Sequence, residues 1–231
     1  TLFRSPKYFQ PLFVSIYYLI ASFIQIALGV GVAYLVSFGC KASNLFKSVY
    51  FFPSLINSVA IGFIFIFFLQ PGSTLDTVLS FLHLDGLINY WLQDHKFINV
   101  SMAGVSVWRY VGYNIVMFAA AMASISPDIL EAARVDGASR WQQLRHIIIP
   151  GISTILGLQL FLALTGALSA FETPYIMTGG GNGSMTFIIQ TVNYAFQNHR
   201  VGLASAMAMI LLILCILIIS IQKLVFRNKE V

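Results

Sequence analysis

Residues 201–222 read VGLASAMAMILLILCILIISIQ, a continuous apolar run without a charged side chain. The hydrocarbon core of a bilayer is about 30 Å thick, and a helix needs about 20 apolar residues to cross it. Inside lipid, a helix satisfies its own backbone hydrogen bonds, whereas a closed barrel would need short segments of alternating polarity. The run therefore predicts a transmembrane helix.

Four more stretches have the same character and predict four more spans. Of the 231 residues, 58% are hydrophobic and 9% are charged, whereas soluble domains carry about 25% charged residues. This composition excludes a stand-alone cytosolic enzyme. It predicts an all-α membrane protein, a bundle of five transmembrane helices within one transmembrane domain of residues 1–231. The four other predicted spans are Pro11–Phe38, Ser48–Gln70, Ile98–Ala123 and Gly151–Phe171.

Basic residues near the ends of the spans predict the orientation, because Lys and Arg are retained on the cytoplasmic side. With the loop 124–150 in the cytoplasm, Lys41, Lys47, Arg134, Arg140, Arg145, Lys223, Arg227 and Lys229 lie inside, and Arg4, Lys7, Lys96 and Arg200 lie outside. Arg4 and Lys7 do not fit this pattern, and a span before them would explain the pair. We therefore expect six spans in the full protein, with both ends inside.

Two outer segments are interpreted as structural. Ser73–Gln93 has apolar residues at helical spacing on both sides of a turn at Asp85-Gly86, which predicts a pair of interfacial helices that caps the bundle. Thr178–Ser184 reads TGGGNGS and lacks the lysine of a phosphate-binding loop. We expect a flexible extracytoplasmic loop there. The histidines form no His-x-x-x-His pair, and no metal site is expected.

The loop between the third and fourth spans reads SPDILEAARVDGASRWQQLRHIIIP over residues 126–150 and predicts two short helices. Pro127 suits the first helical position, and Asp128 with Glu131 matches a capping box. Gly137 permits the left-handed backbone that ends a helix. The first helix is therefore expected between Pro127 and Gly137.

The second helix of this loop begins with another capping box, formed by Ser139 and Gln142. Its helical spacing places Trp141, Leu144 and Ile148 on one face. Proline lacks a backbone N–H and clashes with the preceding turn, so we expect the helix to end at Pro150.

The first helix of the loop presents a docking surface. Ala132 and Ala133 leave one face nearly bare, so that another protein can approach closely. Glu131 offers a carboxylate near the N-terminus, where the helix dipole favours negative charge. A loop that merely rests on lipid headgroups is the alternative. A DNA-reading helix-turn-helix is disfavoured, because membrane spans tether both ends.

Here the chain resembles a known family. Glu131-Ala132-Ala133, then Gly137, then Ile147-Ile148-Ile149-Pro150 is similar to the EAA loop of the permease subunits of bacterial binding-protein-dependent ABC importers, although that family usually has leucine at the position of Ile149. Asp136-Gly137-Ala138 resembles the carbohydrate-importer branch, which includes the maltose permeases. Trp108–Asn114 and Phe171–Gly181 also resemble segments of these sugar permeases, and the resemblance extends over residues 12–223.

The resemblance implies a multi-pass permease of the bacterial cytoplasmic membrane that transports a sugar or oligosaccharide. The implied partners are a second homologous permease, a cytoplasmic ATPase dimer and an extracytoplasmic solute-binding protein, and no nucleic acid is expected. ATP and Mg would bind to the ATPase, so this chain would be no enzyme and would hold no cofactor. The implied coupling residues are Glu131, Ala132, Ala133, Asp136, Gly137, Ile147 and Pro150.

Arg109 is the single charged residue within a span, and charges inside membranes are expensive enough to mark functional candidates. Gly112 and Tyr113 follow it on one helix face, which we interpret as partly open and partly polar. The alternative is that Arg109 snorkels toward the outer end of its helix or pairs with Glu172.

Asn57 is a second pathway candidate, because Pro53, Asn57 and Ser58 interrupt the second span with a proline and small polar groups. Packing between helices is the alternative interpretation. The full predicted set for the substrate pathway is Asn57, Arg109, Tyr113, Asn114, Glu172 and Tyr175.

The sequence fits two other functions less well. A secondary carrier or channel half that works without an ATPase would be expected to carry ionisable residues near the membrane midplane, and the spans are nearly uncharged. A membrane-embedded enzyme is disfavoured because the chain lacks His-Glu-x-x-His and Gly-x-Ser-x-Gly motifs.

Overall fold

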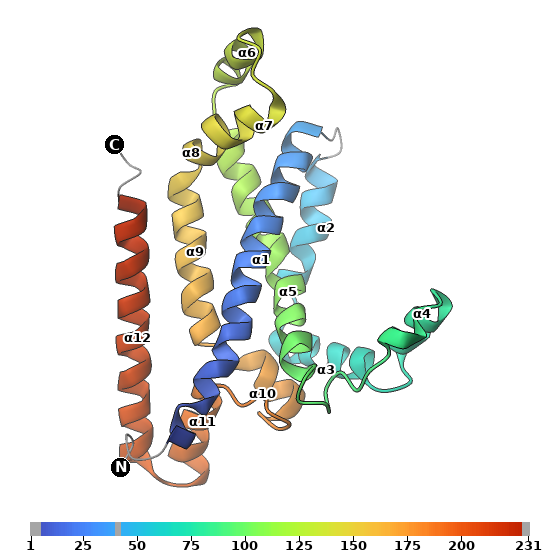
Figure 1. Ribbon diagram of the computed structural model, residues 1–231, viewed down its shortest axis with the longest axis vertical. Helices are drawn as coiled ribbons and strands as arrows, with labels where there is room; N and C mark the ends of the chain where they lie inside the picture. Colours follow the sequence, from blue (N-terminus) through green and yellow to red (C-terminus); the bar gives the residue numbers. More distant parts are fainter. Residues whose placement is uncertain (1–5, 40–42, 228–231) are drawn as a thin grey trace. The chain divides into compact units, whose positions relative to one another are not determined.

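The computed structural model describes residues 6–39 and 43–227, and within these ranges every regular element is helical. Arg4, Lys41 and Lys229 of the orientation argument lie outside the described residues. Figure 1 shows the helices in chain order. They are α1 (Gln10–Gly39), α2 (Ser43–Leu55), α3 (Ser58–Leu69), α4 (Thr74–Phe81), α5 (Ile98–Ala123), α6 (Pro127–Val135), α7 (Arg140–Gln143), α8 (Ile149–Gly151), α9 (Ser153–Leu168), α10 (Glu172–Thr178), α11 (Phe187–Val192) and α12 (Val201–Arg227).

The described residues hold three to five candidate membrane spans. Gln10–Gly39, Ser153–Thr178 and Val201–Leu224 are each long and apolar enough to cross a bilayer. Helices α2 with α3, and α5 with α6, qualify when each pair counts as one span. The predicted all-α membrane fold is confirmed, and helices α1, α5 and α12 cover the runs that were predicted from composition.

The second predicted span, residues 48–70, is not one helix. Helix α2 continues two residues past Pro53 to Leu55, and α3 begins at Ser58. Between them, Asn57 has a non-helical ψ of 140°, and its side chain accepts a hydrogen bond from the Val59 N–H at 2.8 Å. Such a cap starts a new helix and stops the previous one. The interruption expected from Pro53, Asn57 and Ser58 is therefore confirmed, and the helix breaks at Asn57 rather than at the proline.

Two further boundaries differ from the prediction. Within the candidate span Ser153–Thr178, helix α9 ends at Leu168, earlier than the predicted end at Phe171, and Phe171 is the N-cap of helix α10. In the outer segment 73–93, α4 forms as expected, but only a three-residue 3₁₀ turn at Asp85–Leu87 follows it. The predicted second interfacial helix is wrong, because local turns at residues 88–97 take up the backbone hydrogen bonds instead.

The chain forms two compact units. The first unit comprises the described parts of Thr1–Ser22, Ile56–Val107 and Leu164–Ile219, and the second comprises those of Phe23–Leu55, Trp108–Ala163 and Ser220–Val231. The first unit has a core in which residues such as Val14, Ile61, Ile98, Met102 and Met177 are buried together. Phe187 of α11 packs with Met207 of α12 in a smaller cluster of the same unit.

The core of the second unit joins helices α1, α5 and α9 to the loop 124–150. Phe118 and Met122 of α5 pack with Ala33 of α1, and Leu130 of α6 and Ile148 belong to the same buried cluster. The loop is therefore anchored in the core of this unit rather than resting on it from outside.

Helices α2 and α5 of the second unit approach each other very closely. A Cβ atom built on Gly112 would lie 1.6 Å from the carbonyl oxygen of Tyr50. The interpretation of Gly112 as part of an open face is wrong, because the α2 backbone fills the space beside it.

Candidate coupling loop and pathway residues

The N-cap of helix α6 is Ser126, two residues before the predicted capping residue Asp128. The side chain of Ser126 accepts a hydrogen bond from the Asp128 N–H at 3.3 Å, and Pro127 occupies the first turn. The predicted position of Pro127 is confirmed. The capping box of Asp128 with Glu131 is wrong, because Ser126 is the N-cap, which leaves the Glu131 carboxylate exposed.

The C-terminal end of α6 is closed by a backbone motif. The N–H of Ala138 donates to the carbonyl of Ala133 at 2.9 Å, and the N–H of Gly137 donates to that of Arg134 at 3.0 Å. This pair of bonds is the Schellman arrangement, which requires a left-handed residue after the helix. Gly137 has a φ of +83°, which confirms its predicted role.

Helix α7 starts with the predicted capping box. The N–H of Ser139 donates to Gln142 Oε1 at 2.7 Å, and the N–H of Gln142 donates to Ser139 Oγ at 3.3 Å. Both bonds are present, so the prediction is confirmed. The Ser139–Gln142 capping box and Gly137 thus place α6 and α7 on either side of a single tight turn.

The second loop helix does not end at Pro150. Leu144–Ile148 forms a π-helical turn in which the N–H of Ile149 reaches the carbonyl of Leu144, and α8 and α9 follow. A wider turn relieves the clash between a proline ring and the carbonyl four residues before it. The wider turn also shifts the helix phase, so Trp141 is 65% exposed while Ile148 is buried, and the predicted shared face is wrong.

Leu130 is the buried side chain of α6. Glu131 and Ala132 are exposed, Ala133 is half-buried, and Val135 is 88% exposed. Helix α6 is bent by 75° from α5. It therefore presents an exposed face that combines a carboxylate, a small side chain and an apolar one.

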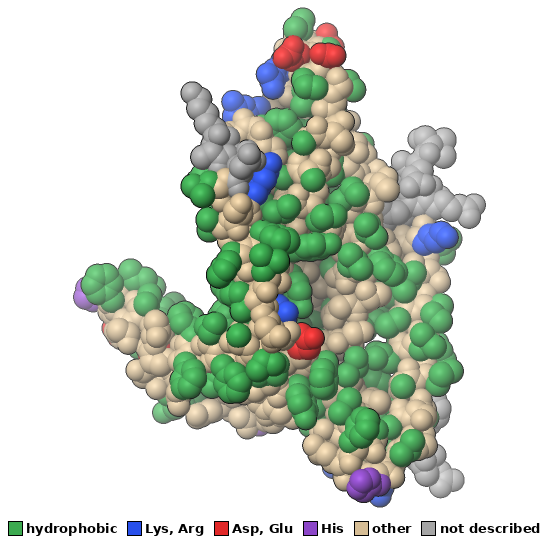
Figure 2. All heavy atoms as spheres, turned by 180° about the vertical axis from the view of Figure 1, so that it is seen from behind, with side chains coloured by type: hydrophobic (Ala, Val, Ile, Leu, Met, Phe, Trp, Pro, Cys, Tyr) green, Lys and Arg blue, Asp and Glu red, His purple; other side chains and the backbone are tan. Residues whose placement is uncertain are grey.

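Acidic and basic side chains lie close together on this loop. Figure 2 shows acidic side chains gathered over the end of the second unit where α6 lies, with basic side chains beside them. The acidic residues of this region are Asp128, Glu131 and Asp136, all exposed. The other implied coupling residues lie nearby in the chain, with Ile147 half-buried against the unit core and Pro150 exposed.

Gln143 is a structural residue of the loop that sequence reasoning missed. It is buried, and its Nε2 donates to the carbonyl oxygen of Ala138 at 2.9 Å. The bond ties α7 to the turn that follows α6. A second glutamine after the capping glutamine was the only signal in the sequence, and it does not predict burial.

The pathway candidates on α5 are more enclosed than expected. Arg109 is buried, with its guanidinium carbon 5.0 Å from the ring centroid of Tyr110. Tyr113 is half-buried beside Phe51, with ring centroids 6.5 Å apart. Asn114 is buried where α5 meets Gly29 of α1. Asn114 therefore lies at a helix crossing.

The pathway candidates of the first unit meet where α3 packs against α10. Ser58 Oγ donates a hydrogen bond to Glu172 Oε2, next to the Asn57 cap. Glu172 is exposed at the first turn of α10. Tyr175 is exposed and stacks on Phe171, with centroids 4.8 Å apart. This corner thus brings together three of the predicted residues, Asn57, Glu172 and Tyr175.

The glycine-rich loop after α10 is tied down, so the expectation of a flexible loop is wrong. Asn182 Nδ2 donates to the carbonyl of Leu92 at 3.1 Å, and Asn99 Nδ2 donates to the carbonyl of Gly183 at 3.1 Å. Ser184 is fully buried and hydrogen-bonds to Thr178. These long-range bonds to the segment 92–99 are invisible in the local sequence.

The family model described as "Binding-protein-dependent transport system inner membrane component" matches residues 25–231. Probable ABC transporter permease protein YurN of Bacillus subtilis is 32% identical over 99% of this chain and 80% of its own length. The probable starch degradation products transport system permease protein AmyD of Thermoanaerobacterium thermosulfurigenes is 28% identical over 88% of this chain and 69% of its own.

A solved structure has the same fold. A chain from the crystal structure of a bacterial alginate ABC transporter, in complex with an alginate pentasaccharide-bound periplasmic protein, matches with a TM-score of 0.88. The match covers 98% of this chain and 81% of the other at 20% identity, which is evidence for the shared fold.

Proposed function

This chain belongs to the family of binding-protein-dependent transport system inner membrane components, and from this premise we propose that it forms part of the membrane pathway for a sugar or oligosaccharide. It is a multi-pass permease subunit of an ABC importer of the inner membrane, and its role is transport rather than catalysis. The carbohydrate class is supported by a relative named for starch degradation products and by the fold shared with an alginate transporter.

The exposed face of α6 carries the mechanism. A separate cytoplasmic ATPase binds to this face. When the ATPase closes on ATP and Mg, it moves α6 and the helices attached to α6. Ala132 and Ala133 allow close approach, Glu131 pairs with a basic residue of the ATPase, and Val135 adds apolar area. The remaining residues of the coupling set are Asp136, Gly137, Ile147 and Pro150.

The supporting residues explain how motion of α6 would be transmitted. Leu130 is buried with Phe118 and Met122 of α5 and with Ile148, so a displacement of α6 acts directly on this core. Packed interiors deform little, and they transmit strain to their neighbours. The turn at Gly137 and the Gln143 bond keep α7 and α6 moving as one body.

The full importer would contain further subunits. A second, homologous permease would complete the pathway, since one chain of three to five candidate spans presents long exposed apolar helices such as α12. A solute-binding protein would deliver the sugar to the outer side, as the family description implies. Residues 1–231 would act as one transmembrane domain in this assembly.

The substrate pathway is proposed to include Asn57, Glu172 and Tyr175, whose polar and aromatic groups are grouped where α3 meets α10. Sugars bind to proteins through hydrogen-bonding groups combined with aromatic faces, and this corner offers both. Arg109 and Tyr113 of α5, which belong to the second unit, are proposed as further pathway residues. Asn114 was predicted with them, but its burial at the α1 crossing favours a packing role.

The coupling proposal is tested with Glu131→Lys in the complex purified with its partner subunits. We expect loss of ATPase association and of uptake, because the charge is reversed on the docking face. Arg145→Gln is the matched control, since Arg145 is exposed on the same loop and outside the proposed face. Normal ATPase association and uptake in Glu131→Lys would refute the coupling role.

The substrate class is tested separately. The complex is reconstituted in proteoliposomes with its binding protein, and ATP hydrolysis is measured with individual mono- and oligosaccharides. Stimulation by one or more sugars is expected. A complete panel without stimulation, in a complex that still hydrolyses ATP and binds its solute-binding protein, would exclude the carbohydrate assignment while leaving the coupling role intact.

A further inference from the structure

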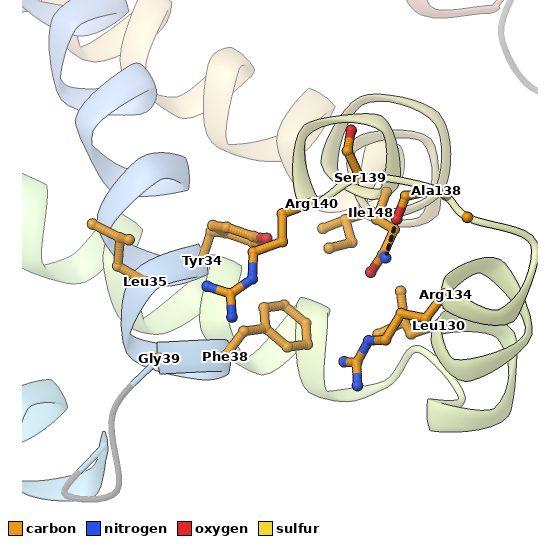
Figure 3. Close-up of a pocket in the computed structure, with 12 residues that line it drawn as sticks. Tyr34, Leu35, Phe38, Gly39, Leu130, Arg134, Ala138, Ser139, Arg140 and Ile148 are labelled. Carbon is orange, nitrogen blue, oxygen red and sulfur yellow. Dashed lines mark hydrogen bonds between the residues drawn. The ribbon is translucent and has the colours of Figure 1, made fainter.

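A pocket of about 550 Å³ lies in the second unit, between the C-terminal end of α1 and the turn that joins α6 to α7. Its volume is within the range of about 300–1,000 Å³ that is typical of sites for small molecules. Figure 3 shows Tyr34 and Phe38 of α1 on one side and Leu130 and Arg134 of α6 on another.

Two arginines, Arg134 and Arg140, line this pocket together with no acidic residue. Figure 3 shows both guanidinium groups extending toward Phe38. Within residues 6–39 and 43–227, neither arginine forms an ion pair with an acidic side chain. Two like charges that face one cavity repel each other, and an anion between them removes this cost. Arginine matches the geometry of phosphate oxygens especially well, because its planar group donates two parallel hydrogen bonds.

The remaining lining of the pocket is largely apolar. Tyr34, Leu35 and Phe38 come from α1, and Leu130 and Ile148 come from the loop side. Leu35 is 63% exposed and Phe38 is also exposed at the edge of the pocket. A soluble anion would leave these side chains uncovered, whereas a molecule that joins a phosphate to acyl chains would cover them.

The position of the pocket also favours a lipid. It lies at the end of the apolar helix α1, on the side of the loop 124–150, which the basic residues predict to face the cytoplasm. Anionic lipids of the cytoplasmic leaflet attract basic residues, and basic pockets between transmembrane helices on this side bind their headgroups. Aromatic side chains such as Tyr34 belong at the same membrane interface.

We propose that this pocket binds the phosphate group of an anionic phospholipid of the inner leaflet. Arg134 of α6 and Arg140 of α7 hold the phosphate from two sides of the turn, and the glycerol and acyl chains lie along Leu35 and Phe38. The lipid thus fastens the coupling loop to the end of α1. This inference goes beyond the transport role and does not depend on which solute is carried.

The test measures lipid retention by native mass spectrometry of the complex purified with its partner subunits. Phosphatidylglycerol is titrated into the wild type and into the double variant Arg134→Gln/Arg140→Gln. We expect the variant to lose about tenfold in apparent affinity, equivalent to about 1.4 kcal/mol. Arg145→Gln serves as the control, because Arg145 is exposed on the same loop and does not line the pocket.

Further arms identify the ligand. Phosphatidylcholine and inorganic phosphate are each expected to bind more weakly than phosphatidylglycerol. Equal retention of phosphatidylglycerol in wild type and double variant, equal binding of phosphatidylcholine, or equal competition by inorganic phosphate would each overturn the proposal. Binding of phosphatidylglycerol only to permease subunits purified without the ATPase would overturn the proposal and assign the two arginines to the protein interface instead. Should the glutamine variant fail to assemble, Arg134→Lys/Arg140→Lys keeps the charge without the planar donors and is expected to bind with intermediate affinity.

Discussion

Gly137 holds the turn between α6 and α7 through its backbone conformation. Its φ of +83° is accessible to glycine at little cost, and a Cβ atom at this position would meet nothing within 4 Å. The demand for glycine here is therefore conformational and not a matter of space. Gln143 acts on the same turn through its side chain, which donates a hydrogen bond to the carbonyl oxygen of Ala138.

Gly137→Ala is expected to destabilise the turn by about 1–2 kcal/mol, because an L-residue pays this cost in a left-handed conformation. The measurement is limited proteolysis of the loop together with thermal denaturation of the purified complex. Gly166→Ala is the control, since Gly166 lies in α9, and a Cβ there also meets nothing within 4 Å. If both variants are cleaved at the same rate, the turn does not depend on Gly137.

At the level of elements, α6 depends on one buried contact and on its caps. A nine-residue helix is too short to be stable alone in water. Leu130 is the buried side chain of this helix and therefore supplies most of its tertiary stabilisation. Helices α2 and α5 depend instead on a backbone contact, since Gly112 lies directly against the carbonyl of Tyr50.

Leu130→Ala is expected to cost about 2–5 kcal/mol, the usual range for a buried leucine truncated to alanine. The loss should appear as faster proteolysis between α5 and α7 and as ATP hydrolysis that no longer responds to the solute-binding protein. Ile129→Ala is the matched control, because Ile129 is the neighbour of Leu130 in the chain and its side chain is 53% exposed. Equal protection of the loop in both variants would show that α6 is held by other contacts.

Gly112→Ala is expected to prevent the close packing of α2 on α5, because a methyl group would overlap the Tyr50 carbonyl oxygen. The measurement is the yield of monodisperse complex and its melting temperature. Gly104→Ala lies on the same helix and meets nothing within 4 Å, so it should behave as wild type. A normal melting temperature for Gly112→Ala would mean that the two helices are further apart than described.

For the whole molecule, the orientation in the membrane is predicted from the positions of its basic residues. Exposed apolar side chains dominate α1 and α12, whereas Arg134, Arg140 and Arg145 are exposed on the loop 124–150. Lys96 and Arg145 are both exposed and lie outside the candidate spans, and the distribution of basic residues along the chain predicts that they lie on opposite sides of the membrane.

Cysteine labelling tests this orientation in a background with Cys40→Ser and Cys215→Ser. Lys96→Cys is expected to react with an impermeant maleimide added to spheroplasts. Arg145→Cys is expected to react only in inverted membrane vesicles, because the basic residues predict that the loop 124–150 faces the cytoplasm. Labelling of Arg145→Cys in intact spheroplasts would reverse the topology and remove the coupling proposal with it.

Much of this protein could be read from local sequence. Membrane spans follow from composition, because the free energy of placing a helix in lipid is close to a sum over its own residues. The turn at Gly137 and the capping box of Ser139 and Gln142 were also predictable, since these bonds join residues a few positions apart. Pro53, Asn57 and Ser58 also indicated a break in the second span, although the helix continues past Pro53 and breaks at Asn57.

Only the tertiary structure decided which residues meet across the chain. Three features became visible only when distant helices were brought together. Leu130 is a core residue, and Gly112 lies where two helices cross. Arg134 and Arg140 line one pocket. Local hydrogen bonds and apolar runs are specified by residues within one turn of each other. Packing depends on the shapes of side chains far apart in sequence, and so no local pattern determines it.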